Sequence, residues 1–277
     1  MADKTFIDKI GAIPRSYIYV LIIILIIIPL LKPIGLPAST DPYTLDVFHT
    51  ISSLPPDSKV LVNIQISASG YLSFGPWLVV LSKQLFEMPV KVIYCSFAAA
   101  NPGVIDLMAS EVDYTKKEYG VDWIVLDWVP GGETGKAAFA KDIRSVVSTD
   151  WKYDKPLGEY PIMDDINKIT DFDIIVVSCS GTAGVLECIR QWVTPYGMPF
   201  YTNAPPQDVP RYYAFIAAGQ VTGMINGNIG IAYYERLFGS LGGASKMLDV
   251  QSLVMLTVLI LMLIGNVSYF ASKGRKK

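Results

Sequence analysis

The sequence predicts an α/β protein with one doubly wound, Rossmann-like domain, built on a mostly parallel five-stranded sheet and flanked by an N-terminal and a C-terminal transmembrane helix. Short, nearly continuous apolar runs alternate with helical segments, which is typical of a parallel sheet covered on both faces. Two longer apolar runs without charged residues lie near the two ends of the 277-residue chain. The composition is 51% apolar with a mean hydropathy of +0.37, which exceeds that of an ordinary soluble domain and favours membrane segments.

The first apolar run, residues 17–31, follows a tail of residues 1–16 that carries basic side chains. Its length is close to the roughly 20 residues that cross the hydrocarbon core, although Pro29 lies near its end. We therefore expect a retained transmembrane helix. The alternative is a signal peptide cleaved near residues 36–40, but Leu36-Pro37-Ala38 departs from the small-residue pattern of a cleavage site.

The second apolar run, residues 250–271, is followed by a basic tail, residues 272–277. Basic residues next to a span stay on the cytoplasmic side, so we expect a two-pass protein of the cell membrane. Both termini are then cytoplasmic and the main domain is extracytoplasmic. The tail itself also suits a position beside anionic lipid.

Charge and cysteine content limit the partners. Acidic residues outnumber basic ones between residues 32 and 249, and an acidic domain is a poor partner for nucleic acid. The three cysteines, Cys95, Cys179 and Cys188, are odd in number and have no CxxC spacing, so we expect buried free thiols and not a disulfide framework. Free thiols also leave a cytoplasmic domain open as an alternative.

Between the two spans, the sequence predicts a linker at 32–56 with a short helix at 44–54, then the Rossmann-like domain at 57–239, and a second linker at 240–249. The predicted strands are 59–67, 90–97, 121–129, 171–180 and 198–203. The predicted helices are 74–88, 102–120, 134–147, a short helix near 161–169, 183–196, and a nearly continuous helix over 207–239.

In such sheets ligands bind beyond the carboxyl ends of the strands, so the loops there hold the candidate ligand-binding residues. They are Gly131, Gly132, Thr134 and Lys136 after the third strand, and Ser178, Ser180 and Thr182 before a helix whose amino end favours an anion. The first loop fails the Walker pattern, since Ala137 stands where Ser or Thr would hold Mg²⁺. A tight turn with a capped helix is the alternative for both loops.

We predict no catalytic residue, metal or cofactor. The only histidine, His49, lies ahead of the first strand, so a histidine relay or a zinc site would need it from the linker. Cys179 has no evident base nearby. Asp122 and Asp127 differ by an odd number on one strand and are expected to face opposite sides of the sheet.

Glycines at 219, 223, 227 and 230 interrupt the predicted helix over 207–239. The first three recur every four residues and would form one flat ridge, which allows another backbone to approach closely. We expect Gly219, Gly223, Gly227 and Gly230 to form an interface, and a neighbouring protomer or another membrane subunit is one of two possible partners. The alternative partner is the sheet or first helix of the same domain.

Three segments carry a resemblance: KKEYGVDWI (116–124), PGGE (130–133) and GQVTGMINGNIGIAYYERL (219–237). Together they resemble an uncharacterised family of prokaryotic membrane-anchored α/β proteins, over most of residues 55–240. In that family the matching C-terminal segment is glycine-rich and ends in a tyrosine-glutamate pair, here Tyr234 and Glu235. The resemblance implies the fold and brings no catalytic residue with it.

We therefore expect a non-catalytic binding or assembly module in a membrane protein complex, as a homo-oligomer or with other membrane subunits. The alternative is a nucleotide- or small-ligand-binding protein, or an enzyme, that uses the loops at the carboxyl ends of the strands. A solute receptor that serves a transporter is a third possibility.

Overall fold

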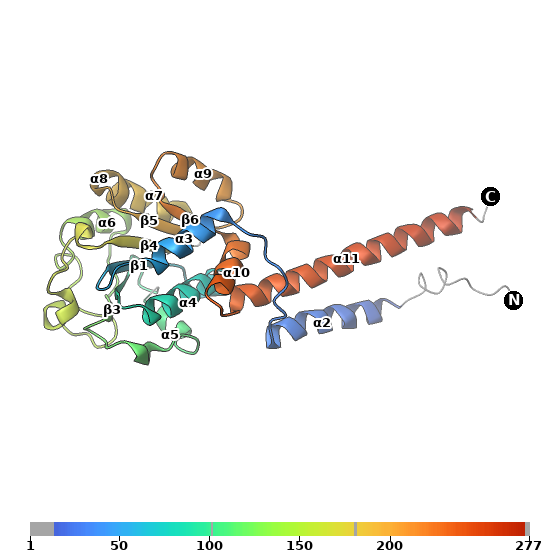
Figure 1. Cartoon of the computed structure of the whole chain (residues 1–277), viewed down its shortest axis with the longest axis horizontal. Coiled ribbons are helices and arrows are strands. Elements are labelled where there is room, and N and C mark those ends of the chain that lie inside the picture. Colours follow the sequence, from blue (N-terminus) through green and yellow to red (C-terminus); the bar gives the residue numbers. More distant parts are fainter. Residues whose placement is uncertain (1–13, 101, 180–181, 275–277) are drawn as a thin grey trace. The chain divides into compact units, whose positions relative to one another are not determined.

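A parallel sheet of six strands forms the centre of the domain (Figure 1). The computed structural model describes residues 14–100, 102–179 and 182–274. They form two compact units, one of residues 38–244 and one that joins the segments before Ala38 and after Ala244. The strands run in the order β3-β2-β1-β4-β5-β6, and every neighbouring pair is parallel. Their bounds are β1 Lys59–Gln65, β2 Lys91–Ser96, β3 Trp123–Val125, β4 Ile174–Cys179, β5 Phe200–Ala204 and β6 Gly223–Asn226.

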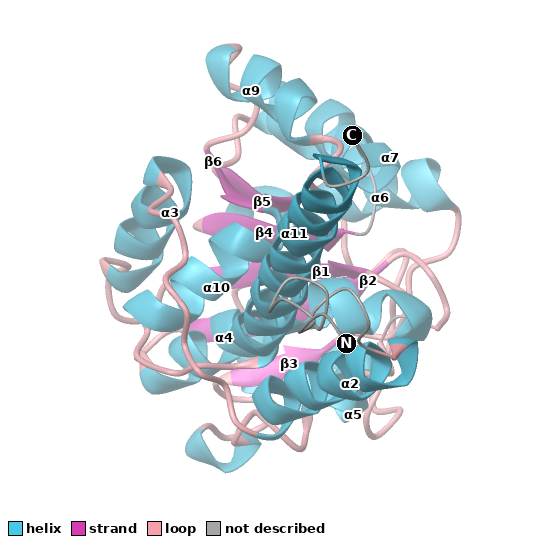
Figure 2. Cartoon of the chain, turned by 90° about the vertical axis from the view of Figure 1, so that its right-hand side faces the viewer, coloured by secondary structure: helices cyan, strands magenta, loops and turns pink. Residues whose placement is uncertain are grey.

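The domain is doubly wound, as the sequence predicts. The strand order reverses between β1 and β4, which is the Rossmann arrangement. Helices α4 and α10 lie on one face of the sheet, and α6 and α7 on the other (Figure 2). The helices of the domain are α3 Pro42–Ser52, α4 Tyr71–Glu87, α5 Val104–Met108, α6 Gly132–Lys141, α7 Thr182–Cys188, α8 Thr194–Tyr196, α9 Val209–Ala217 and α10 Gly227–Leu237.

The central strands are apolar because both of their faces are covered. In β1 residues 60–64 are each at most 1% exposed, and β4 is buried along its whole length. Burying one such aliphatic side chain contributes roughly 1.5–3 kcal/mol to folding. The polar exception in β1 is Asn63, which is completely buried.

The sixth strand corrects the predicted five-stranded sheet. The segment 207–239 is not one helix but α9, then β6, then α10, and Tyr201 of β5 pairs with Gly223 of β6. A Cβ at residue 223 would lie 2.7 Å from Val47 Cγ2 of α3 and 3.0 Å from the Tyr201 ring. The missing side chain thus lets α3 pack onto the edge strand β6.

The single glycine ridge predicted on that helix is therefore wrong. Gly223, Gly227 and Gly230 are buried within their own domain, and a Cβ at Gly230 would lie 2.7 Å from Thr44 Oγ1. Gly219 is exposed and has a φ of +69°, in the turn that ends α9. These contacts favour the same-domain alternative, and an interface with another subunit stays a prediction.

Helix α3 arises from the segment expected to be a linker with a short helix. Asp41 caps it, because its carboxylate accepts hydrogen bonds from Thr44 N (3.1 Å) and Thr44 Oγ1. Pro42 occupies the first turn, where a missing N–H costs nothing. The α3 side chains Val47 and Ile51 are buried, so the helix belongs to the core of the domain.

Other predicted elements are shorter in the structure. The predicted helix over 102–120 is reduced to α5 and a 3-10 turn, Tyr114–Lys116, while 3-10 turns at Pro161–Met163 and Ile169–Asp171 replace the short helix near 161–169. Strand β3 ends at Val125, because Leu126 bridges in an antiparallel manner to Asp150. Helix α7 continues as a π-helix over Ile189–Val193.

The second unit holds the two apolar helices, α2 Arg15–Leu31 and most of α11 Gly243–Gly274. Within the described residues one helix is long and apolar enough to cross a membrane, Gly243–Phe270, with a mean hydropathy of 2.3. Helix α2 is apolar over 17 residues. The predicted linker 240–249 is mostly the first turns of α11. The tail residues 1–13 and 275–277 lie outside the described residues.

Asp249 of α11 binds the segment that follows α2. Its carboxylate accepts hydrogen bonds from the backbone N–H groups of Ile34 (2.7 Å), Gly35 (2.9 Å) and Leu36 (2.7 Å). The Asp249 side chain is 1% exposed. Three donors on one buried carboxylate fix this part of the chain to α11.

Candidate functional site

The structure brings together α6 and α7, the helices that follow the two loops that the sequence singles out at the carboxyl edge of the sheet. Lys136 of α6 forms an ion pair with Glu187 of α7. The Lys136 side chain is only 2% exposed, and its Nζ lies 4.8 Å from the centroid of the Phe97 ring. Lys136 is therefore not a free cation for a phosphate, because its charge is balanced inside the domain.

A second ion pair, closer to solvent, joins α6 to the π-helix Ile189–Val193 that continues α7. Arg190 donates two hydrogen bonds to the Glu133 carboxylate, at 2.7 and 2.8 Å, and Gln191 donates a third at 3.0 Å. These hydrogen bonds lower the pKa of Glu133 to about 2. Trp192 Nε1 also donates to the backbone oxygen of Lys136 (2.9 Å), so several polar contacts hold the amino-terminal half of α6 against the π-helix that continues α7.

The glycine loop before α6 is stabilised by contacts among its own residues. Gly131 and Gly132 have φ values of +91° and +54°, which disfavour any other residue. Thr134 Oγ1 donates to Gly131 O (2.7 Å), and a Cβ at Gly135 would lie 2.1 Å from Pro130 O. This geometry is that of a tight turn leading into a helix.

Of the predicted residues before α7, Ser178 lies in β4 and is completely buried, and its Oγ has no hydrogen-bond partner among the described residues. Asn63 Oδ1 of the adjacent strand β1 also has none. Ser180 lies outside the described residues, and Thr182 begins α7 with its side chain outside them. Asn63 is not among the residues that the sequence predicts for a site, although a polar residue inside the apolar run VLVNIQI is a local signal.

The three cysteines are free and buried, as predicted, and two of them lie near Lys136. Burial raises the pKa of Cys95 and of Cys188, so both thiols are protonated at neutral pH. Cys188 Sγ accepts weak hydrogen bonds from Asn63 Nδ2 (3.5 Å) and Gln65 Nε2 (3.8 Å). These thiols act as small packing groups and not as thiolate nucleophiles.

The two aspartates near the third strand accept hydrogen bonds from neighbouring backbone N–H groups. Asp122 Oδ2 accepts a hydrogen bond from Glu118 N (2.8 Å), and Asp127 Oδ1 accepts one from Trp128 N (2.7 Å). Across residues 14–100, 102–179 and 182–274, no group of three His, Cys, Asp or Glu side chains is arranged to hold a metal ion.

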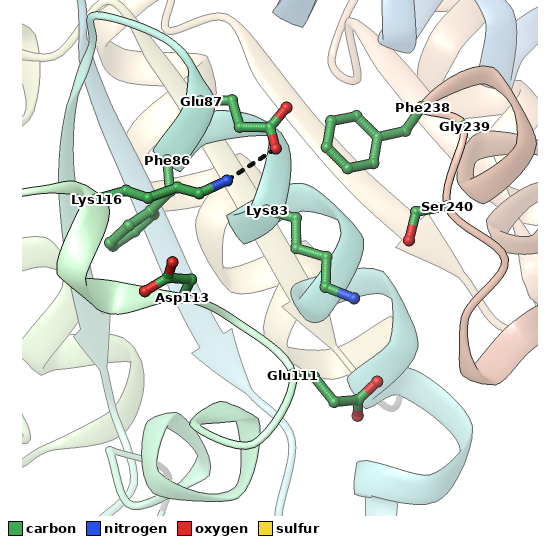
Figure 3. Close-up of a pocket in the computed structure, with 9 residues that line it drawn as sticks. All are labelled: Lys83, Phe86, Glu87, Glu111, Asp113, Lys116, Phe238, Gly239 and Ser240. Carbon is green, nitrogen blue, oxygen red and sulfur yellow. Dashed lines mark hydrogen bonds and ion pairs between the residues drawn. The ribbon is translucent and has the colours of Figure 1, made fainter.

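A charged pocket of about 330 Å³ lies elsewhere on the domain (Figure 3). It is lined by Lys83 and Glu87 of α4, by the loop 111–116 and by the turn 238–240. Lys116 and Glu87 form an ion pair at 3.0 Å with both side chains about half exposed, which contributes at most about 1 kcal/mol. No local sequence pattern marks this pocket, because its walls come from three distant segments.

The turn 238–240 belongs to a joint between α10 and α11. Glu235, 1% exposed, accepts hydrogen bonds from Gly242 N (2.9 Å) and Ala244 N (3.0 Å) and so caps the first turn of α11. Tyr234 is buried, donates to Gln84 Oε1, and packs edge-on against Trp77 and Phe48 at ring distances of 5.0 and 5.1 Å. The tyrosine-glutamate pair thus fixes α10 to the core and caps the start of α11.

Fold and contacts together define a class of protein. It is an α/β protein with a Rossmann-like parallel sheet, and within the described residues the last helix of its domain is followed by one apolar helix that is long enough to span a membrane. Comparison with protein-family models, with curated proteins and with solved structures finds no match in any of the three. The family resemblance therefore depends on the three quoted segments alone.

Proposed function

We propose that this chain is a two-pass membrane protein whose α/β domain lies outside the cytoplasm and acts as a non-catalytic binding or assembly module, in an oligomer or with other membrane subunits. The observation that carries the proposal is α11. It is apolar, its side chains are largely exposed over the stretch Gly243–Phe270, and it follows the last helix of the domain after a short capped turn.

The contacts around α11 support a structural role. Glu235 caps its first turn, and Asp249 binds the backbone of residues 34–36 just after α2. A carboxylate that accepts three N–H groups is a strong connection. The two apolar helices would then act as one anchor, with α2 as the second, shorter span.

The polar groups at the carboxyl edge support a non-catalytic role. Lys136 is balanced by Glu187, and the thiols of Cys95 and Cys188 are protonated because burial raises their pKa. A catalytic nucleophile or base needs a group that can change its bonding to a substrate. In this domain Lys136 is held in an ion pair with Glu187, and the thiols of Cys95 and Cys188 are buried.

The two apolar helices also support oligomerisation. Both α2 and α11 present large apolar side chains to their surroundings, for example Ile23, Leu259 and Leu263. In a bilayer such faces contact lipid or other spans, and spans pack together where van der Waals contact is good. We therefore propose a second copy or another membrane subunit as the partner of the anchor.

Cysteine labelling of intact cells tests the topology. The three native thiols are at most 4% exposed, so the wild-type chain gives little background with a membrane-impermeant maleimide. Lys141 is exposed, and Lys141→Cys is expected to react in intact cells, while a protease site fused after Lys277 stays protected. Labelling of Lys141→Cys only after lysis would overturn the extracytoplasmic assignment.

Native mass spectrometry of the full chain in mild detergent tests assembly. We expect a mass that corresponds to more than one copy, or to a complex with another membrane protein. A monomer alone, across several mild detergents and in lipid nanodiscs, would contradict the proposal.

A small-ligand site at the carboxyl end of β4 is the second candidate, because Ser178 Oγ is buried there without a hydrogen-bond partner among the described residues. A ligand that binds only the folded state raises its stability. We expect a thermal shift with a nucleotide, a sugar or an organic acid, and we expect Ser178→Ala to reduce that shift. No shift with any of these compounds dismisses this candidate.

A further inference from the structure

An apolar pocket of about 190 Å³ lies beside the edge strand β3, away from the carboxyl ends of β1 and β4. Its walls include Ile105 and Ala109 of the α5 segment, Trp123 and Val125 of β3, and the indole of Trp151. Two charged side chains, Asp106 and Lys152, also line it. Small-molecule sites combine these features, an apolar cavity with a few placed polar groups.

The aromatic wall of this pocket is held in place by other rings. Trp123 is 3% exposed, Tyr114 stacks on it with centroids 4.7 Å apart, and Tyr119 meets it edge-on at 4.9 Å. Trp151 differs, because its side chain is 39% exposed while its backbone N–H donates to Val125 O (2.9 Å). A fixed backbone below a partly exposed indole gives a ready stacking surface.

Among the described residues, the ammonium group of Lys152 contacts aromatic rings and no carboxylate. Its Nζ lies 5.0 Å from the Tyr119 centroid, 5.1 Å from that of Tyr153 and 5.5 Å from that of Trp123, and the side chain forms no ion pair there. Cation–π contacts at exposed sites contribute about 0.5–1 kcal/mol each. An ammonium has three donors, so Lys152 can keep its place over the rings and still bind a carboxylate.

Asp106 supplies the opposite charge at the same pocket. It lies in the first turn of α5, is exposed, and its carboxylate accepts no hydrogen bond and forms no ion pair among the described residues. One unpaired carboxylate and one unpaired ammonium therefore border a single apolar cavity. The complement of such a pair is a molecule with both charges.

The volume limits the size of that molecule. An engineered apolar cavity of about 150 Å³ holds benzene, so 190 Å³ accommodates one aromatic ring, with charged substituents at the mouth. A dinucleotide or a peptide is too large for this cavity.

We propose that this pocket binds a small aromatic zwitterion of the aromatic amino acid class. The ring occupies the cavity against Trp123 and Trp151, the ligand ammonium binds Asp106, and the ligand carboxylate binds Lys152. This site is independent of the anchor and of the carboxyl edge, so the failure of either proposal leaves the other intact.

Calorimetric titration of the full chain in detergent tests the ligand class with four probes. L-phenylalanine carries all three features, phenylacetate lacks the ammonium, phenethylamine lacks the carboxylate, and glycine lacks the ring. We expect saturable binding of phenylalanine, at least tenfold weaker binding of the two single-charge compounds, and none of glycine. Equal affinity for phenylalanine and phenylacetate, or no saturable phenylalanine binding at about 1 mM, overturns the proposal.

Charge-removing variants test the roles of the two side chains. Asp106→Asn is expected to weaken the binding of phenylalanine and of phenethylamine about tenfold and to leave the affinity for phenylacetate unchanged. Lys152→Met is expected to weaken the binding of phenylalanine and of phenylacetate about tenfold and to leave the affinity for phenethylamine unchanged. Asp164→Asn and Lys141→Met, at exposed positions elsewhere, are the matched controls and keep wild-type affinity. Trp151→Ala abolishes binding, and an unchanged unfolding midpoint shows that each variant is folded. Parallel losses with all probes in both charge variants would overturn the assignment.

Discussion

At the scale of single residues, a few buried carboxylates organise the irregular parts of the chain. Asp150, Glu235 and Asp249 are each 1% exposed, and each accepts hydrogen bonds from backbone N–H groups. Asp150 accepts five in total: from Tyr119 OH (2.7 Å), Tyr160 OH (2.9 Å), and the backbone N–H groups of Lys152, Tyr153 and Lys155 at 2.9–3.0 Å. One side chain thereby orders the long connection that follows α6.

Replacing Asp150 tests this role. Asp150→Asn keeps the shape but removes the charge and replaces one acceptor oxygen with a donor, so several buried donors lose their partner. We expect a loss of about 2–4 kcal/mol in the free energy of unfolding, since each hydrogen bond to a charged group contributes about 1.5–3 kcal/mol. Denaturant unfolding followed by tryptophan fluorescence measures it. Asp164→Asn, at an exposed position, is the control, and an equal loss there would contradict the assignment.

The same residue predicts a pH dependence. Burial acts to raise the pKa of Asp150, but hydrogen bonds from Tyr119, from the backbone of Lys155 and Tyr153 and from Tyr160 outweigh it, and the pKa is lowered. A lowered pKa contributes stability that is complete above the unfolded-state pKa of about 3.9 and is lost as the pH falls below it. The free energy of unfolding of the wild type should therefore fall more steeply than that of Asp150→Asn as the pH drops below about 4. Parallel curves would rule out this contribution.

Gly135 gives a second test at this scale. A Cβ there would lie 2.1 Å from the backbone oxygen of Pro130, which cannot move without opening the turn before α6. We expect Gly135→Ala to lower the free energy of unfolding by about 1–3 kcal/mol. At Gly158 a Cβ would meet no atom within 4 Å, so Gly158→Ala is the matched control with a change of at most about 1 kcal/mol. Equal losses would show that the contact with Pro130 is not the cause.

Some site residues could be predicted from the sequence, but their contacts could not. The loops of Lys136 and Ser178 follow predicted strands, so the rule for parallel sheets places them at one edge. The partner of Lys136 is Glu187, 51 residues later, and no local pattern marks that pairing. The pocket at Asp106 and Lys152 was missed for the same reason, because its two charges meet only after α5 packs beside β3.

At the scale of elements, the sequence predicts four of the longer strands well, whereas it does not predict the short strand β6. Strands β1, β2, β4 and β5 lie within the predicted ranges or one residue beyond, and β1, β2 and β4 are nearly continuous apolar runs. Strand β6 has only four residues, and Gly219, Gly223 and Gly227 in and around it recur at a helical spacing, so the local pattern favoured a helix. Tertiary packing decided otherwise, since β5 offers an open edge and α3 covers the other side of β6.

Glu235 is tested at this scale because it connects two helices. Glu235→Gln removes the charge and one acceptor oxygen from the cap of α11, and losing a cap costs about 1 kcal/mol. The amides of Gly242 and Ala244 should then exchange with deuterium roughly five- to tenfold faster, as a difference of 1.4 kcal/mol is a factor of ten. Glu159→Gln, on an exposed 3-10 turn, is the control. Unchanged exchange at both amides would contradict the capping role.

At the scale of the whole molecule, segments at opposite ends of the chain meet at Asp249. Asp249→Asn removes one acceptor from the group that binds Ile34, Gly35 and Leu36. We expect faster hydrogen exchange at these three amides in lipid nanodiscs, with the exchange of the sheet amides unchanged. Gln251→Ala, exposed two residues further along α11, is the control and should leave all of them as in the wild type. Faster exchange in the control as well would point to general loosening of α11.

The sheet order also affects how the chain is made. Lys59, at the start of β1, meets Asp173 beside β4 across 114 residues of sequence. Ribosomes add about 5–20 residues per second, so β1 emerges roughly 6–23 s before β4, the strand that covers its inner edge. During synthesis β1 therefore carries an open row of backbone donors and acceptors, and nascent chains that dwell at this stage are exposed to mispairing with one another.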